Sequence, residues 1–187
     1  EISCSLVGSE MCIRDSFDMV TNEPLRGETH QGFSDDSSWA RGQSWAVYGL
    51  ALCYHYTHEE AILPLFERVT KYFIDHLPED YVPYWDLIFS DGSCEPRDTS
   101  AAAIAACGIL EMEKYYHNQE FLDIAKKMMS SLSEKYTTVD YLQSNGIIKD
   151  GMYSRKHGHK SECTSWGDYF YLEALMRMKK SDWKIYW

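Results

Sequence analysis

Residues 98–110 read Asp98-Thr99-Ser100-Ala101-Ala102-Ala103-Ile104-Ala105-Ala106-Cys107-Gly108-Ile109-Leu110. The stretch opens with short polar residues of the kind favoured at a helix N-cap. Small or apolar residues then follow with no polar face, and this pattern predicts a helix that continues to about residue 116. Because a helix that is apolar on every side is buried on every side, we expect this one at the centre of a core.

Two other stretches follow the same plan. Asp36-Ser37-Ser38 precedes an apolar helical run that ends near residue 57, and Glu162-Cys163-Thr164-Ser165 precedes another that ends near residue 178. The acidic markers at positions 36, 98 and 162 are spaced by 62 and 64 residues. A repeated helical unit of this length predicts an array of helical hairpins.

The segments between these runs each carry one apolar stripe at helical spacing, which predicts amphipathic helices. The two stripes are Ile62, Phe66, Val69 and Phe73, and then Phe121, Ala125, Met128 and Leu132. Pro64 fits the first turn of its helix, where a missing N–H costs little. Buried inner helices that alternate with amphipathic outer helices predict an all-α fold, a two-layer α/α toroid of which this chain forms about half.

The composition excludes some classes of partner. The 187 residues carry a formal net charge of −11, which argues against nucleic acid because binding it needs a basic face. No apolar run approaches the ~20 residues of a membrane span. The six cysteines show no paired spacing. We therefore expect reduced thiols in a cytoplasmic protein without a membrane partner.

The segment 29–45 is unusually polar for the start of a buried helix, and it reads THQGFSDDSSWARGQSW. Aromatic rings can cover the apolar faces of a sugar, an arginine can pair with a carboxylate, and amides can bind hydroxyls. Arg41 and Trp45 are one helical turn apart on one face, which is suited to an anionic sugar. The alternative is that Arg41 caps a neighbouring carbonyl and that Trp45 belongs to the core.

This segment also resembles glycoside hydrolase family 88, the unsaturated glucuronyl hydrolases. The resemblance covers about residues 17–187 and includes three further blocks in the same order: Val82-Pro83-Tyr84-Trp85-Asp86, residues 95–103 and residues 166–175. It implies roughly half of a six-hairpin (α/α)6 barrel whose inner and outer helices alternate. It also implies a substrate-binding site and no cofactor, with unsaturated uronide oligosaccharides as partners. By that resemblance, Gln31, Arg41 and Trp45 match positions that contact the unsaturated uronate. The assigned site further includes Trp39, with His30 and Gln43 in supporting places behind the contact residues. Trp85 is assigned to the wall of the site, although packing within its loop is the favoured alternative.

In the resembled family, an aspartate donates a proton to C4 of a terminal unsaturated uronic acid, water adds at C5, and the neighbouring sugar leaves. That aspartate and its partner precede the Thr-His-Gln-Gly block in the family, and neither Asp15 nor Asp18 matches them. We therefore expect the catalytic pair to be missing here and the chain to be an inactive C-terminal part. Residues 1–16 resemble translated sequencing-adapter read-through, so we take 17–187 as the native domain.

The sequence also allows other interpretations. His157, His159 and Cys163, or His55 and His58, would suggest a metal, but neither set has a second ligand pair, and we expect none. An unsaturated rhamnogalacturonyl hydrolase is the rival enzyme, although its motif departs from Trp-Ala-Arg-Gly-Gln. A sugar-binding or scaffold protein without catalysis is the rival of a different class.

Overall fold

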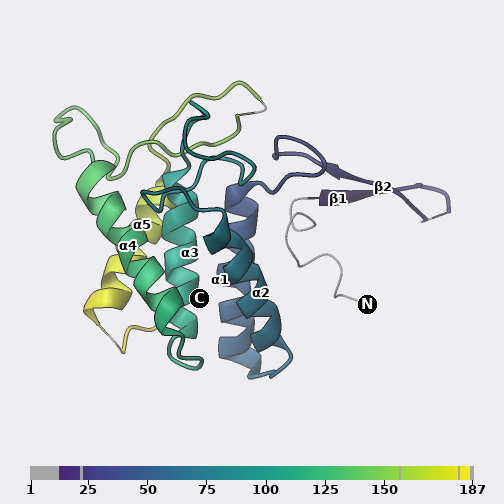
Figure 1. Ribbon diagram of the computed structural model, residues 1–187, viewed down its shortest axis with the longest axis horizontal. Helices are drawn as coiled ribbons and strands as arrows, with labels where there is room; N and C mark the ends of the chain where they lie inside the picture. Colours follow the sequence, from purple (N-terminus) through teal and green to yellow (C-terminus); the bar gives the residue numbers. More distant parts are fainter. Residues whose placement is uncertain (1–12, 22, 156, 181, 186–187) are drawn as a thin grey trace.

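The structure is a computed structural model that describes residues 13–21, 23–155, 157–180 and 182–185. Five helices form the body of the molecule (Figure 1), and a hairpin of two antiparallel strands projects from it. The strands are β1 (Ile13–Phe17) and β2 (Pro24–Thr29). The helices are α1 (Ala40–Thr57), α2 (Ile62–Asp75), α3 (Thr99–Met112), α4 (Gln119–Lys135) and α5 (Ser165–Lys179).

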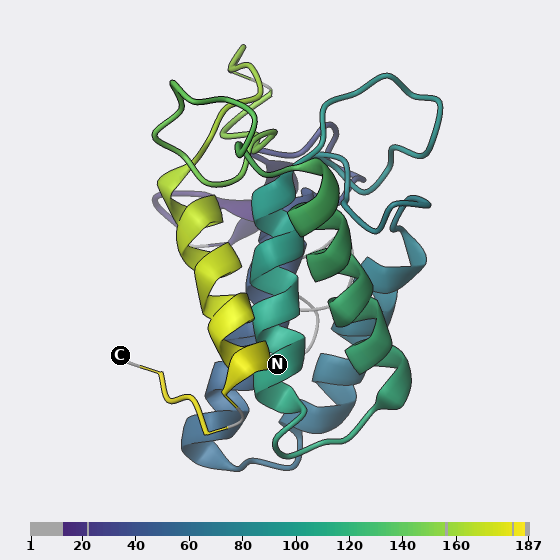
Figure 2. The same cartoon turned by 90° about the vertical axis from the view of Figure 1, so that its left-hand side faces the viewer.

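The helices form two layers. The inner layer consists of α1, α3 and α5, with α3 packed between the other two, while α2 lies against α1 and α4 lies against α3. In Figure 1, α1 and α3 run in the same direction and α2 runs opposite to them; Figure 2 shows α5 running beside α3 in the same direction, with α4 opposite. The predicted alternation of inner and outer helices is therefore confirmed.

Helix α3 is the centre of the core, as its sequence predicts. All of its residues except Leu110 are buried. At Gly108 a Cβ atom would lie 2.7 Å from the Tyr48 backbone, so the absence of a side chain there lets α1 and α3 approach closely.

Burial is incomplete for the other two inner helices within the described chain. Trp45 of α1 is 38% exposed, and Tyr169 and Leu172 of α5 are 37% and 47% exposed. Trp45 and Tyr169 both contact Phe170, at ring-centroid distances of 5.1 and 5.0 Å. The rings of Trp45, Phe170 and Tyr169 thus adjoin one another on the side of the inner layer that bears no outer helix.

The N-caps agree with the sequence in two helices of the inner layer and differ in the third. Asp98 accepts a hydrogen bond from the Ser100 N–H, and Thr164 accepts one from the Gly167 N–H. Helix α1 begins after Trp39, which makes no side-chain cap, and the predicted caps at 36–38 lie before that point. Their polar side chains order the preceding loop instead, as Ser37 does by bonding to Asp86.

Two local predictions also need correction. Helix α3 ends at Met112 and not near residue 116, because the backbone enters a turn at Glu113. The β1–β2 hairpin was not predicted, and its first strand begins inside the segment 1–16. Residues 1–12 lie outside the described residues, so the interpretation of 1–16 as non-native sequence stays a prediction.

A buried ionic network joins the inner helices at their C-terminal ends. Arg177 of α5 donates to Glu111 of α3 and, with a distance of 2.9 Å between its Nε and Oε1, to Glu173 of its own helix. His55 of α1 lies 2.9 Å from Glu111. Lys114 adds a bond of 2.7 Å to the same carboxylate. Five side chains thus interact at this end of the inner layer, which would otherwise be apolar.

Among the helices that the structure describes, none is both long and apolar enough to cross a lipid bilayer.

Candidate functional site

The inner helices all begin at the same end of the molecule, beneath the loops 76–98 and 136–164 (Figure 2). Backbone hydrogen bonds join these loops to the N-termini of the helices. The Thr99 N–H donates to the Asp150 carbonyl, and the Ala40 N–H donates to the Trp85 carbonyl. Helix N-termini carry unpaired N–H groups and the positive end of the helix dipole, so this end favours an anion.

Arg41 lies in the first turn of α1 and is only 3% exposed. Its Nη2 atom donates to the carbonyl oxygens of Met152 and Tyr153 at 2.7 and 2.5 Å. Its guanidinium carbon lies 4.7 Å from the ring centroid of Trp39 and 5.0 Å from that of Trp166. The cation is therefore held by one loop backbone and two indole faces.

Trp45 lies on the same side of α1 as Arg41. Arg41 contacts Trp166, and Trp45 packs edge-to-face on Phe170 with centroids 5.1 Å apart. Trp166 and Phe170 are themselves one turn apart on α5, so both α1 residues face that helix. The structure thus shows the carbonyl-capping role of Arg41 that the alternative proposed. It does not bury Trp45 in the core.

Asp98 is the acidic partner of Arg41. Its Oδ2 atom lies 3.7 Å from Arg41 Nε, and its side chain is fully buried. Burial raises the pKa of Asp98, while Arg41 and the hydrogen bonds from Ser100 and Met152 oppose that rise. Burial likewise lowers the pKa of Arg41, and Asp98 partly offsets the change. The pair places a buried cation and anion side by side at the helix ends.

Gln31 and His30 lie in the loop that leads from β2 to α1. The Oε1 atom of Gln31 is buried and accepts no hydrogen bond within the described chain, so it remains an acceptor for a hydroxyl group. His30 is exposed, and its ring lies 5.1 Å from that of His157 in the loop 136–164.

Gln43, which was also assigned to the substrate site, faces the outer layer in the structure. Its Nε2 atom donates to the Val69 carbonyl of α2 at 3.1 Å, and its side chain is fully buried. Position 43 faces the outer helix because it lies two residues, or about half a turn, beyond Arg41. Gln43 therefore joins the two layers.

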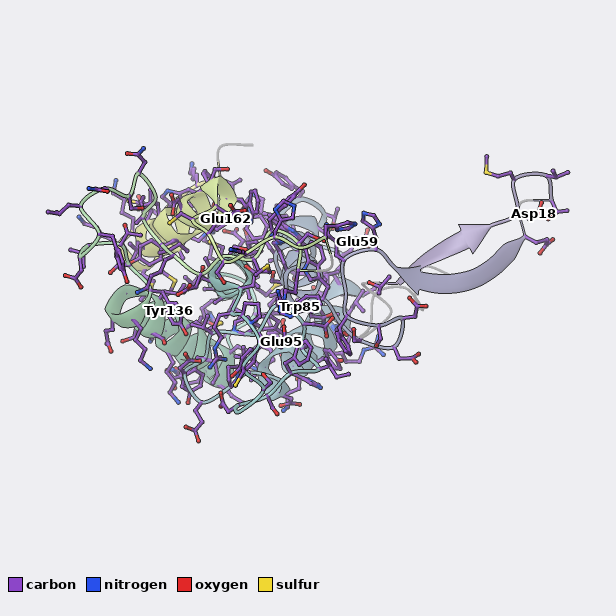
Figure 3. The ribbon with its side chains drawn as sticks, turned by 90° about the horizontal axis from the view of Figure 1, so that it is seen from above. Asp18, Glu59, Trp85, Glu95, Tyr136 and Glu162 are labelled. Carbon is purple, nitrogen blue, oxygen red and sulfur yellow. The ribbon has the colours of Figure 1, made fainter. Side chains whose placement is uncertain are left out.

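Trp85 is also largely buried, at 3% exposure, and its indole N–H donates to Glu95 at 2.9 Å. Both residues are labelled in Figure 3, in the loops above the helix ends. With Phe33 and Arg155 they line a cavity of about 220 Å³. Trp85 is thus packed within its loops and lines this cavity with one part of its surface.

Sequence reasoning missed three contributors to this end of the molecule. Trp166 belongs to a quoted block, but only the structure shows its ring against Arg41. Asp86 is fully buried and orders the loop before α1 by accepting bonds from the Phe33 N–H and the Ser37 hydroxyl. Met152 contributes only its backbone, whose carbonyl accepts from Arg41, so its side chain gives no signal in the sequence that could have revealed this role.

Three further acids have structural partners within the described chain. Asp168 accepts the N–H groups of Ile147 and Ile148 at 2.9 Å, and Glu173 pairs with Arg177. Asp18 lies at the tip of the hairpin (Figure 3), where backbone hydrogen bonds from Thr21 and Val20 lower its pKa. Hydrogen-bonded carboxylates of this kind stabilise loops and helix ends.

Two features define the class of this protein. The inner helices are parallel to one another and are covered by antiparallel outer helices, and the polar end of the inner layer holds a buried arginine. Together they describe an α/α-toroid protein. The model of Glycosyl Hydrolase Family 88 matches residues 9–181. The chain belongs to that family, and the match begins within the segment 1–16.

Named relatives agree with this assignment. The chain is 47% identical over 177 residues to an unsaturated chondroitin disaccharide hydrolase of Streptococcus agalactiae, covering 91% of this chain and 44% of the relative. A crystal structure of unsaturated glucuronyl hydrolase from the same species is 46% identical with a TM-score of 0.83, covering 94% of this chain and 48% of that one. The corresponding Bacillus sp. GL1 structure is 38% identical with a TM-score of 0.82, covering 89% and 46%.

The chain thus spans less than half the length of the relatives it matches. Its two helical layers are part of the (α/α)6 barrel of the unsaturated glucuronyl hydrolases. This confirms the predicted family and fold class.

Proposed function

We propose that this chain supplies the carboxylate-binding side of an unsaturated glucuronyl hydrolase. The substrates are oligosaccharides, of glycosaminoglycan type, that a polysaccharide lyase has left with a terminal C4=C5 unsaturated uronic acid. The observation that carries the proposal is Arg41, held between Trp39 and Trp166 beside the N-termini of the inner helices. A fixed cation flanked by indoles complements a planar sugar acid.

The proposed binding residues follow from their places in the structure. Arg41 pairs with the uronate carboxylate, while Trp39 and Trp45 cover the apolar faces of the sugar. Gln31 offers its unpaired amide oxygen to a sugar hydroxyl. His30 and Trp85 support the surrounding loops through His157 and Glu95. Gln43 has no place in this set, because it bonds to α2.

The reaction consumes one water. A proton adds to C4 of the enol ether, the hydroxyl of water adds to C5, and the resulting hemiketal opens with release of the neighbouring sugar. The acids described at this end are engaged elsewhere: Asp86 and Asp168 accept backbone N–H groups, and Asp98 is fully buried. We infer that the proton donor belongs to the part of the enzyme that this chain does not cover.

The proposal places the enzyme in the cytoplasm. The cysteines at positions 53, 94, 107 and 163 are free thiols, as expected in a reducing compartment.

The test uses a chimeric enzyme, defined as the Streptococcus agalactiae relative with its matching segment replaced by residues 17–181 of this chain. We expect it to remove the enol-ether absorbance of an unsaturated chondroitin disaccharide, while the relative lacking that segment does not. The 187-residue chain alone should bind without turnover. A chimeric enzyme that unfolds cooperatively but leaves every unsaturated uronide unchanged would refute the assignment.

A further inference from the structure

Asp98 does more than its capping role requires. Its Oδ1 atom accepts the Ser100 N–H at 3.2 Å, the Ser100 hydroxyl at 2.5 Å and the Met152 N–H at 3.4 Å. Its Oδ2 atom is buried and accepts no hydrogen bond within the described residues. An asparagine or serine would cap α3 about as well. Capping therefore leaves the second, charged oxygen unexplained.

The surroundings of Arg41 explain that oxygen. A guanidinium that is 3% exposed needs a counter-charge, because an unpaired buried ion is costly. The carbonyls of Met152 and Tyr153 accept its hydrogen bonds but carry no net charge. Asp98 Oδ2 lies 3.7 Å from Nε, on another edge of the same guanidinium.

The same carboxylate also fixes the loop that holds the cation. Met152 donates its N–H to Asp98 Oδ1 and accepts from Arg41 through its carbonyl. Asp98 therefore determines the place of Arg41 twice, directly through Oδ2 and indirectly through the backbone of Met152.

We propose that Asp98 is a positioning residue for uronate binding, which fixes the guanidinium of Arg41 from α3 and from the loop around Met152. Asp98 itself is fully buried and does not touch the sugar. The inference rests on the proposed function, in which Arg41 pairs with the uronate.

The main test compares Asp98→Asn with Ser100→Ala. The asparagine keeps an oxygen for the cap but loses the charge, while the alanine at 100 removes one cap bond and keeps the charge. In the chimeric enzyme we expect D98N to raise KM for the unsaturated disaccharide at least tenfold with little change in kcat. S100A should leave KM within about twofold, although both lower the unfolding temperature. Equal KM values for the two variants would overturn the proposal.

A double-mutant cycle keeps the test decisive if D98N folds poorly. In an Arg41→Lys background, the guanidinium that Asp98 positions is already absent, so D98N should have no further effect on KM. Multiplicative effects of the two substitutions would show that Asp98 acts independently of Arg41, and would contradict the proposal.

A spectroscopic measurement on the 187-residue chain separates this inference from the proposed function. The Arg41 Nε–H signal in a nitrogen–proton NMR spectrum, identified by its loss in R41K, should shift in D98N and stay in place in S100A. If the chimeric enzyme shows no turnover but this signal shifts, only the proposed function fails. A signal that D98N leaves unchanged overturns the positioning role, whatever the activity.

Discussion

At the scale of single residues, Glu111 is the clearest case of a charge that the fold depends on. It is fully buried, and it meets Arg177, Lys114 and His55. Burial alone would raise its pKa, but Lys114 and Arg177 outweigh that effect and the pKa is lowered. A lowered pKa in the folded state means that the ionised carboxylate stabilises the fold.

We therefore predict that Glu111→Gln lowers the free energy of unfolding at pH 7 by about 3 kcal/mol, the cost of breaking a buried ion pair. The stabilisation by Glu111 is present above the ordinary glutamate pKa and is lost as pH falls through the lower, folded-state pKa. Urea unfolding of both proteins between pH 3 and pH 7 measures this. The difference between them should shrink on acidification, and a constant difference would contradict the account.

Residue-scale prediction succeeded where the cause is local and failed where it is distant. Asp98 could be predicted as a cap, because its partner Ser100 is two residues away. The carbonyl that holds Arg41 lies 111 residues further along the chain, so no local pattern reveals it. The direction of Gln43 was missed for a related reason, since a buried amide can face either the site or the outer layer.

At the scale of helices, the contact between α1 and α3 depends on backbone approach at Gly108. An added Cβ would lie 2.7 Å from the Cα and N atoms of Tyr48, whereas at Gly49 of α1 nothing lies within 4 Å. The two glycines thus form a matched pair in neighbouring helices, one in a tight contact and one in open space.

We predict that Gly108→Ala destabilises the chain by about 2 kcal/mol through overpacking. Gly49→Ala should instead stabilise it by up to about 1 kcal/mol, because alanine is the better helix former. Chemical unfolding of both variants gives the two values. If G108A proved as stable as G49A, the helices could not be packed as closely as described.

The order of the helices was predictable because apolar periodicity records which faces are buried. Helix α3, apolar all round, is indeed buried all round. Helices α1 and α5 show the same pattern and are partly exposed, because the periodicity does not say which neighbour covers a face. The β1–β2 hairpin was missed because its residues show neither a clear alternation nor a glycine-rich turn.

At the scale of the whole molecule, the exposed surface of Trp45, Tyr169 and Leu172 is the feature with the widest consequence. Trp45 of α1 and Tyr169 of α5 both pack against Phe170, and Leu172 follows Tyr169 by three residues on α5. Contiguous apolar surface of this kind marks a site of protein contact.

We predict that the 187-residue chain associates in a concentration-dependent way through this surface. Leu172→Glu should reduce association, while Leu142→Glu should not, although Leu142 in the loop 136–164 is 97% exposed. Sedimentation velocity across a range of concentrations measures the change. Equal effects of the two substitutions would show that exposure alone, and not this surface, causes association.

The most direct test of the central claim, that Arg41 binds the uronate carboxylate, changes the substrate and the protein together. KM of the chimeric enzyme is measured for the unsaturated disaccharide and for its uronate methyl ester. We expect wild-type Arg41 to favour the acid by about 10- to 100-fold, as for a hydrogen bond to a charged group. Arg41→Met should lose most of that preference, and Arg68→Met on the exposed face of α2 should keep it. An equal preference for the acid in all three proteins would contradict the account.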